Sequence, residues 1–499
     1  MKKQNIRILL VYPKIPVTFW SFKYALGFIN KKSTSPPLGL ITVAAMLPVE
    51  WDLKLVDTNV SKLKDTDILW ADYVFISAMN IQKNSALEII ERCKKQQKKV
   101  VAGGPMFTTD PDKFRHISHF ILNEGEITLP EFVQDVLSAH PKPVYATCEH
   151  ARMEDSPAPR LDLLKMNKYA SMSIQYSRGC PFNCEFCDIT LLYGHKVRTK
   201  TKEQLLHELD CLYCAGWRGS VFIVDDNFIG NKPKLNTVIL PAMIRWMQDH
   251  HYPFRFNTQV SIELADNENL MTLMVQAGFW TVFIGIETPH EGSLAECNKS
   301  QNIKRNMLSS IHKIYRYGLH VQGGFIIGFD HDPLTIFESQ IRFIQESGIV
   351  TAMVGLLNAL PKTQLYHRMV KEKRLLETST GDNTDASINF IPKMQLTTLL
   401  TGYRNTLYSL YSSRNYFKRL KTFLKLYRPV RQTRVKISLT DLVALFKSFI
   451  VVGVFSKMRF DFWNLFYWTI FVKPGMLKTT ITYSIYGYHF QKILSRHMK

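Results

Sequence analysis

Residues 177–188 read SRGCPFNCEFCD. Cys180, Cys184 and Cys187 stand here in a CxxxCxxC arrangement, directly after an apolar, strand-like run. Eight cysteines in 499 residues would produce this triple by chance only about 0.002 times per chain. Thiolates are the soft ligands that iron-sulfur clusters need, and a short loop can wrap three of them around one face of a cubane. The stretch therefore predicts a cluster with three protein ligands and one open iron.

The cysteines do not form the pattern of a disulfide framework, because three of the eight fall inside residues 180–187. A reducing compartment is therefore expected. Zinc is an alternative occupant of the triple, since a structural zinc site usually takes four protein ligands. His195 could supply the fourth if residues 191–194 folded back across the loop.

Composition indicates a globular protein of roughly two to four domains, with 46% hydrophobic and 12% aromatic residues. The net charge of +21 is concentrated late in the chain. Residues 391–499 hold 19 Lys and Arg against Asp441 and Asp461, a net charge of +17. No signal peptide is recognisable before the strand-like run at 6–11, so a cytoplasmic location is expected.

The first α/β segment is predicted at residues 1–148, where apolar runs alternate with helix-like stretches. This rhythm predicts a doubly wound, flavodoxin-like parallel sheet. A proline-containing polar stretch at 149–170 is expected to be a linker. The expected strands of the first segment lie at 6–11, 53–56, 74–76, 100–102 and 120–122.

The second segment, residues 171–376, repeats a strand and helix six times, which predicts a partial (β/α)6 barrel. Functional groups of such a barrel lie at the carboxyl ends of its strands. A polar linker at 377–390 and a mainly helical basic region at 391–499 are expected to follow. The expected barrel strands lie at 173–176, 221–224, 254–258, 282–286, 321–327 and 353–357.

The cysteine loop resembles the radical S-adenosylmethionine (radical SAM) superfamily, whose motif is CxxxCx(aromatic)C, with Phe186 as the aromatic residue. The resemblance implies a [4Fe-4S] cluster on Cys180, Cys184 and Cys187, with the open iron chelating SAM. It also implies an external one-electron reductant, cleavage of SAM to methionine and a 5′-deoxyadenosyl radical, and hydrogen abstraction from substrate. The likeness covers roughly residues 171–376.

The same resemblance assigns SAM contacts to residues at the strand ends. Asp225-Asp226-Asn227 takes the place of the family's common Gly-Gly-Glu, which holds the methionine amino group, and acidic side chains can still accept from an ammonium. Gly285-Ile286-Glu287 and Ile326-Ile327-Gly328 resemble the ribose- and adenine-contacting strand ends. The expected SAM contacts are Phe186, Asp225, Asp226, Asn227, Gln259, Ser261, Glu287 and Gly328.

Residues 1–148 resemble the cobalamin-binding domain that precedes many radical SAM cores, through 36–40 (PPLGL), 101–105 (VAGGP) and 123–126 (NEGE). Glycines after a strand let a ligand approach the backbone. The usual Asp-x-His-x-x-Gly element is absent and no histidine precedes His116, so the lower axial position of a bound cobalamin is not expected to be a histidine. A degenerate scaffold is the alternative. The expected cobalamin contacts are Ser77, Gly103, Gly104, Glu124 and Gly125.

The basic region interleaves Lys and Arg with aromatic residues, as in 417–420 (FKRL) and 462–468 (FWNLFYW). Such a sequence suits peripheral association with the anionic inner face of a membrane. No charge-free apolar run reaches the ~18 residues of a spanning helix. A basic face on a packed helical cap is an alternative, and no nucleic-acid partner is expected.

The whole chain most resembles radical SAM proteins with a cobalamin domain and an extra C-terminal domain, the group that includes the hopanoid C-2 methylases. Residues 355–361 (GLLNALP) add to the likeness. The resemblance implies cobalamin-dependent methylation of an unactivated carbon in a small-molecule or lipid-like substrate. Two alternatives stay open: radical cyclisation, oxidation or rearrangement without methyl transfer, and a noncatalytic iron-sulfur protein.

Overall fold

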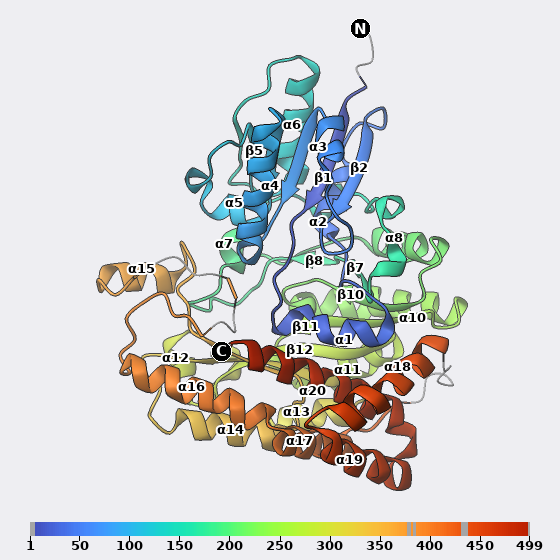
Figure 1. Cartoon of the computed structure of the whole chain (residues 1–499), viewed down its shortest axis with the longest axis vertical. Coiled ribbons are helices and arrows are strands. Elements are labelled where there is room, and N and C mark those ends of the chain that lie inside the picture. The colour runs from blue at the N-terminus through green and yellow to red at the C-terminus, as the bar shows by residue number, and fades with distance from the viewer. Residues whose placement is uncertain (1–4, 377–380, 383–385, 431–437, 498–499) are drawn as a thin grey trace.

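Two parallel six-stranded sheets form the frame of the molecule, one above the other in Figure 1. The computed structural model describes residues 5–376, 381–382, 386–430 and 438–497. Helices from the last part of the chain lie beneath the second sheet in the same view.

The first sheet has the strand order β2-β1-β3-β4-β5-β6. The chain starts at the second strand from one edge, adds β2 outside it and then runs from β3 to β6 in the other direction, which confirms the predicted flavodoxin-like arrangement. All five expected strands are present, and β6 is an addition that covers only two residues. The bounds are β1 Arg7–Tyr12, β2 Asp52–Asp57, β3 Tyr73–Ser77, β4 Lys99–Gly103, β5 His119–Ile121 and β6 Val144–Tyr145.

Helices cover both faces of this sheet. The apolar side chains of α3, α4 and α5 pack with Leu9 and Val74 on one face, and those of α2 and α6 pack with Leu10 and Phe75 on the other. These helices are α2 Leu38–Ala45, α3 Asp65–Trp70, α4 Lys83–Lys95, α5 Pro105–Thr109 and α6 Gly125–Leu137.

The second sheet has the order β14-β13-β12-β11-β10-β7, so all six expected strands are confirmed. Because β7 and β14 are the two edges of the sheet, it is an open half-barrel. Its parallel register brings the carboxyl ends of neighbouring strands to one edge. The bounds are β7 Ser171–Ile174, β10 Gly219–Ile223, β11 Phe254–Val260, β12 Phe279–Glu287, β13 His320–Ile327 and β14 Ala352–Leu356.

The C-terminal helices share one hydrophobic core with the half-barrel. Helix α16 (Leu396–Tyr411) is fixed to β14 because Tyr403 donates to the Val354 carbonyl and Tyr411 to the Ala352 carbonyl. Helices α16 and α17 (Ser413–Leu426) also pack against α14 (Ile336–Ser347). Of the helices within the described ranges, none combines the length and apolar character needed to cross a bilayer.

A segment near the start of the chain lies with these C-terminal helices. It consists of η1 (Phe19–Ser21), α1 (Lys23–Leu26) and η2 (Gly27–Ile29). Phe19 stacks on Phe490 of α20 (Leu477–His497) with ring centroids 4.2 Å apart, and Figure 1 shows α1 beside the second sheet. The chain therefore leaves the first sheet after β1 and returns to it at α2.

Both expected linkers carry residues that are packed against the rest of the molecule. In 149–170, Met153 and Tyr169 are buried, and the Tyr169 hydroxyl donates to Asp57 at 2.9 Å. The stretch 377–390 lies partly outside the described residues. In its described end the Asn389 side chain bonds both backbone groups of Ala359 at 2.8 Å, which ties this stretch to the loop after β14.

Candidate active site

A short antiparallel pair of strands, β8 (Ser177–Arg178) and β9 (Arg198–Thr199), holds the base of the cysteine loop. Gly179 has a φ of +95°, and an added Cβ there would lie 2.5 Å from the Lys196 carbonyl oxygen. Glycine is therefore required at this position. The Cys180 N–H donates to the Gly194 carbonyl at 3.2 Å, which sets the path of the chain into the first cysteine.

The three thiols of the loop are partly buried and form no disulfide. Burial raises the pKa of Cys180 and Cys184, and it raises the pKa of Cys187 to about 12. A thiolate at these positions would therefore need a bound metal to displace its proton. Throughout the described residues no three His, Cys, Asp or Glu side chains converge to hold a single metal ion, and His195 is exposed. A cubane needs no such convergence, because each thiolate binds a different iron atom.

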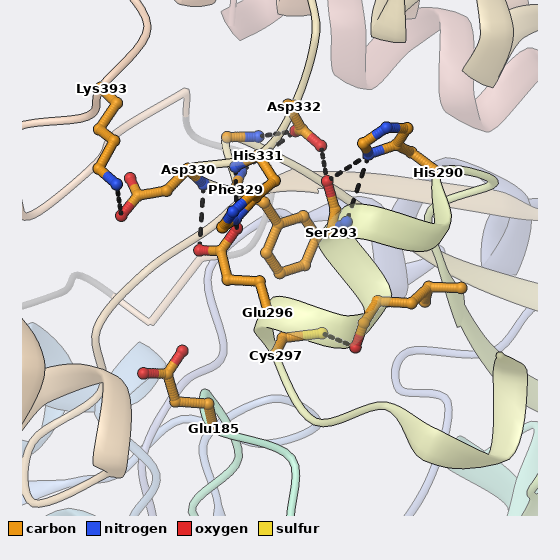
Figure 2. A network of polar contacts seen from close by, with 12 residues as sticks. Glu185, His290, Ser293, Glu296, Cys297, Phe329, Asp330, His331, Asp332 and Lys393 are labelled. Carbon is orange, nitrogen blue, oxygen red and sulfur yellow. Dashed lines mark hydrogen bonds and ion pairs between the residues drawn. The ribbon is translucent and has the colours of Figure 1, made fainter.

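Ion pairs fix the far side of the loop to the half-barrel. Arg368 of α15 (Gln364–Lys371) bonds the Glu185 carboxylate at 2.6 and 2.9 Å, and it also reaches Asp330 at 2.7 Å. The Glu185 N–H donates to the Cys297 carbonyl at 3.0 Å. Figure 2 shows Glu185 and Cys297 beside Glu296, which accepts from the backbone of Asp330. Glu185, which lies between Cys184 and Cys187, is thus held in place by an ion pair with Arg368.

The two aspartates after β10 have different surroundings. Asp225 is fully buried and accepts from the Tyr176 N–H at 2.8 Å and the Ser177 hydroxyl at 2.6 Å, so it anchors the cysteine loop from below. Asp226 is half-buried, and burial together with the charges of Asp225 and Asp188 raises its pKa to about 7. Within the described chain, no other residue donates a hydrogen bond to the Asp226 side chain. Asp226 is therefore the carboxylate that is free to accept from a ligand.

Asn227 and Ser261 join the ends of β10 and β11. The Asn227 side-chain oxygen accepts from the Ser261 N–H at 3.1 Å. The Ser261 hydroxyl is buried and has no hydrogen-bond partner among the described residues. Gln259, two residues earlier at the end of β11, is half-buried. The orphaned, buried Ser261 hydroxyl fits a polar ligand at this edge of the sheet.

Glu287 ends β12 and carries the most unusual backbone of the expected SAM residues, with a φ of +63°. Its carboxylate accepts from Lys299 at 2.6 Å, and both side chains are almost fully buried. Burial alone would lower the pKa of Lys299, but the charges of Glu287, Cys184 and Cys187 raise it above its ordinary value. A permanent cation therefore faces the cysteine loop, and no motif in the sequence indicated it.

Gly328 and Phe186 form another part of the wall. Gly328 has a φ of +107°, and its N–H donates to Asp332 at 2.8 Å. Figure 2 shows Asp332 directed at Ser293, which it bonds at 2.6 Å. Phe186 packs near Phe329, with ring centroids 6.3 Å apart. These contacts fix the strand end and the aromatic residue of the cysteine motif in one apolar layer.

The expected cobalamin contacts lie at the carboxyl edge of the first sheet. Ser77 ends β3 and Gly103 ends β4. An added Cβ at Gly104, where φ is +90°, would lie 2.7 Å from the Ser77 hydroxyl, and one at Gly103 would lie 2.8 Å from the Ile121 carbonyl oxygen. Glycine is therefore required at both positions by the close approach of Ser77 and Ile121, and no side chain from these two residues projects from this edge of the sheet. Gly125 begins α6 nearby.

The Glu124 carboxylate is occupied by arginines of the cysteine loop region, so its side chain faces the cysteine loop. Arg178 bonds Glu124 at 2.9 Å and Glu126 at 2.8 and 3.0 Å, and Arg198 bonds Glu124 at 2.6 and 2.9 Å. All four side chains are largely buried. This set, Glu124, Glu126, Arg178 and Arg198, is termed the interdomain ion cluster. It turns the carboxyl edge of the first sheet toward the cysteine loop.

Three family models match the chain in succession. The B12 binding domain matches residues 26–133, and the radical SAM superfamily matches residues 174–344. A domain of unknown function matches residues 363–499.

Curated relatives resemble the chain over most of its length. An uncharacterised methyltransferase of Synechocystis sp. is 43% identical, over 97% of this chain and 91% of the relative. The hopanoid C-2 methylase of Rhodopseudomonas palustris is 35% identical, over 77% of this chain and 73% of the relative.

Solved structures share the fold. The cobalamin-dependent S-adenosylmethionine radical enzyme OxsB, with aqua-cobalamin and SAM bound, matches with a TM-score of 0.65 and 14% identity, over 99% of this chain and 80% of that one. The radical SAM methyltransferase TsrM of Kitasatospora setae, with cobalamin and a [4Fe-4S] cluster bound, matches with a TM-score of 0.58 and 11% identity, over 99% of both chains.

Proposed function

The chain belongs to the cobalamin-dependent radical SAM methyltransferases, and on that basis we propose that it methylates an unactivated carbon of a lipid-like substrate. Its cofactors are a [4Fe-4S] cluster, SAM and cobalamin. When bound, these groups supply the electron that cleaves SAM, the removal of hydrogen from the substrate and the methyl group.

The ligands of the cluster are Cys180, Cys184 and Cys187. The tight turn at Gly179 and the Arg368–Glu185 ion pair hold the loop in place. Since three thiolates leave one iron without a protein ligand, SAM can bind there directly.

The charged ends of SAM's methionine moiety have complementary partners beside the loop. Asp226 accepts from the ammonium, and Lys299, held by Glu287, attracts the carboxylate. The unpartnered Ser261 hydroxyl adds a hydrogen bond, and Asn227 positions it. Phe186, Gln259 and Gly328 complete the wall of the SAM site, while Asp225 anchors the loop through Tyr176 and Ser177.

The interdomain ion cluster is the observation that carries the proposal. The edge with Gly103 and Gly104, near Ser77 and Gly125, is where cobalamin would be held, and it would supply the methyl group there. Because Glu124 and Glu126 hold Arg178 two residues before Cys180, the cobalamin edge and the SAM edge face each other. Two cofactors that act on one substrate need this arrangement.

A lipid-like substrate is supported by the likeness to a hopanoid C-2 methylase. Peripheral association with an anionic membrane, expected from the basic and aromatic sequence, belongs to the same proposal. It would bring the enzyme to the surface where such substrates are dissolved.

The test is anaerobic reconstitution of the full chain with iron, sulfide and cobalamin, followed by reduction in the presence of SAM with a deuterated methyl group. Total membrane lipids in detergent serve as substrate. We expect 5′-deoxyadenosine to form, and deuterium to enter the lipid fraction only when cobalamin is present. Cys184→Ala is the control and should abolish both.

Three outcomes would contradict the proposal. Label that reaches lipids without cobalamin would exclude the cobalamin-dependent route. Label confined to water-soluble products would exclude a lipid-like substrate. Cleavage of SAM without any labelled product would favour radical chemistry without methyl transfer.

A further inference from the structure

The C-terminal helices leave one apolar surface uncovered. Helix α18 (Leu439–Ile450), the π-helical turn η12 (Val451–Phe455) and α19 (Arg459–Val472) pack together at the edge of the molecule, where Figure 1 shows α18 and α19 as neighbours. Phe446 is 66% exposed, Phe455 78% and Phe471 81%. The α18–α19 face is defined here by Leu442, Phe446, Ile450, Phe455, Phe460 and Phe471, all exposed.

Helix α19 is apolar on both sides. Phe462, Leu465 and Phe466 point into the core, yet Phe460 and Phe471 on the opposite side are exposed. A helix at a water-facing surface normally carries polar residues on its outer side, whereas one that is apolar all round lies in an apolar environment. Large apolar side chains exposed along three consecutive elements mark an interaction site.

A shallow groove runs along α18 within this face. Leu442, Val443, Phe446, Lys447, Ile450 and Val451 line it, and its volume is about 450 Å³. Its walls are almost wholly apolar. Such a groove suits a hydrocarbon chain and offers little to a polar ligand.

The charges around the face are positive. Lys457 and Arg459 are exposed between η12 and α19, and the Arg459 guanidinium lies 4.8 Å from the Phe460 ring centroid. The acidic residues of 391–499, Asp441 and Asp461, are both engaged, the first with Lys478 at 2.8 Å and the second with the Ser413 hydroxyl. The face is therefore apolar in the middle and cationic at its rim.

We propose that the α18–α19 face docks on an anionic lipid bilayer, with its aromatic side chains in the headgroup region. A second copy of this chain is the less suitable occupant, because residues 391–499 carry a net charge of +17 and two such surfaces repel each other. The FKRL stretch does not provide this surface, since Phe417, Arg419 and Leu420 are buried. The inference rests on the membrane association named in the proposed function and assigns a surface to it, and its test does not require methyl transfer.

Vesicle flotation of the full-length protein tests the proposal. Phosphatidylcholine vesicles containing phosphatidylglycerol should carry the protein upward, and pure phosphatidylcholine vesicles should carry much less. Phe455→Ser/Phe471→Ser should reduce the bound fraction about tenfold or more, since two large apolar contacts are lost. Lys457→Gln/Arg459→Gln should weaken binding mainly at low salt, because screening already removes this contribution at high salt.

The matched control is Val49→Ser/Leu69→Ser, which removes two exposed apolar side chains from the first α/β unit and should bind like the unaltered protein. Failure of the unaltered protein to float with anionic vesicles would overturn the proposal, and so would equal flotation of Phe455→Ser/Phe471→Ser. A concentration-dependent dimer in sedimentation velocity that the same substitutions abolish would assign the face to a second copy instead. Cleavage of SAM in detergent should be unchanged in every variant, which separates this test from that of the methylation proposal.

Discussion

Replacing Arg178 with methionine gives the sharpest test of the interdomain ion cluster. Arg178 makes three hydrogen bonds to Glu124 and Glu126, at 2.8 to 3.0 Å, and its side chain is only 11% exposed. Methionine keeps much of the stem but leaves Glu126 buried without a cation. Breaking a buried pair from one side costs about 3–5 kcal/mol, and Arg198 still neutralises Glu124, so we expect about 3 kcal/mol.

The pH dependence of that loss follows from Glu126. Burial alone would raise its pKa, but the hydrogen bonds and charge of Arg178 hold it below the ordinary value. In the unaltered protein the pair therefore stabilises the fold above the unfolded-state pKa of Glu126, and this contribution disappears as pH falls through the lower folded-state pKa. In Arg178→Met burial acts unopposed, so the loss should be largest at neutral pH and smaller in acid, where Glu126 is protonated.

Hydrogen exchange of the holoenzyme measures this change locally. A loss of about 3 kcal/mol predicts roughly hundredfold faster exchange in α6 and in the cysteine loop. Arg160→Met is the control, because Arg160 pairs with Asp162 at 2.8 Å on the surface and should cost about 1 kcal/mol or less. Adding Glu126→Gln to Arg178→Met should recover part of the loss. If Arg178→Met exchanged no faster than Arg160→Met, the reasoning would be refuted.

Three further changes probe the site itself. Lys299→Met should weaken SAM binding to the cluster-loaded protein by roughly tenfold or more in equilibrium dialysis, since Glu287 loses its cation. Lys299→Arg keeps the charge and should retain most of the affinity. If both variants bound SAM equally well, Lys299 would not be a SAM-binding residue. Because the pKa of Asp226 is raised to about 7, its ionisation should lower the free energy of unfolding of the SAM-free protein as pH rises from about 4 to about 7. Asp226→Asn should flatten this pH dependence in chemical denaturation. An unchanged pH dependence in the variant would contradict the prediction. Gly179→Ala would force a Cβ to within 2.5 Å of the Lys196 carbonyl and should lower the iron and sulfide bound per chain, whereas full loading would show that the loop tolerates the change.

The strands were predictable because a parallel sheet covered on both faces is built from continuous apolar runs. Those runs give both sheets directly, and the alternation with helices gives their parallel sense. Strand β6 escaped detection because Val144 and Tyr145 are too short a run to stand out. The placement of η1 and α1 could not be predicted either, because their partners lie more than 400 residues away.

Sequence reasoning identified the cysteine loop and the strand ends around it, but it could not assign individual side chains. Asp225 and Asp226 are chemically identical, and only their burial separates an anchor from a free acceptor. Lys299 pairs with Glu287, and no motif in the sequence around Lys299 indicates this ion pair. Glu124 lies in a recognisable motif, but its carboxylate is occupied by arginines from elsewhere in the chain.

The basic region shows the same limit in another form. Its composition indicates aromatic and cationic residues without saying which of them face outward. Phe417 and Phe446 are the same amino acid on two amphipathic helices, yet tertiary packing buries the first and exposes the second. The composition therefore predicts a membrane-binding region, but only the fold identifies which of its aromatic residues lie on the surface.

The contact between η1 and α20 has a consequence for biosynthesis. His489 accepts from the Tyr24 N–H at 3.3 Å, and its other ring nitrogen lies 3.0 Å from the Phe19 carbonyl, some 470 positions earlier. At translation rates of about 5–20 residues per second, the ribosome needs on the order of half a minute or longer to connect these partners. Until α20 is made, Phe19 lacks its stacking partner Phe490 and Phe22 lacks Tyr486 and His489, so the nascent chain exposes part of this aromatic segment, which chaperones can bind.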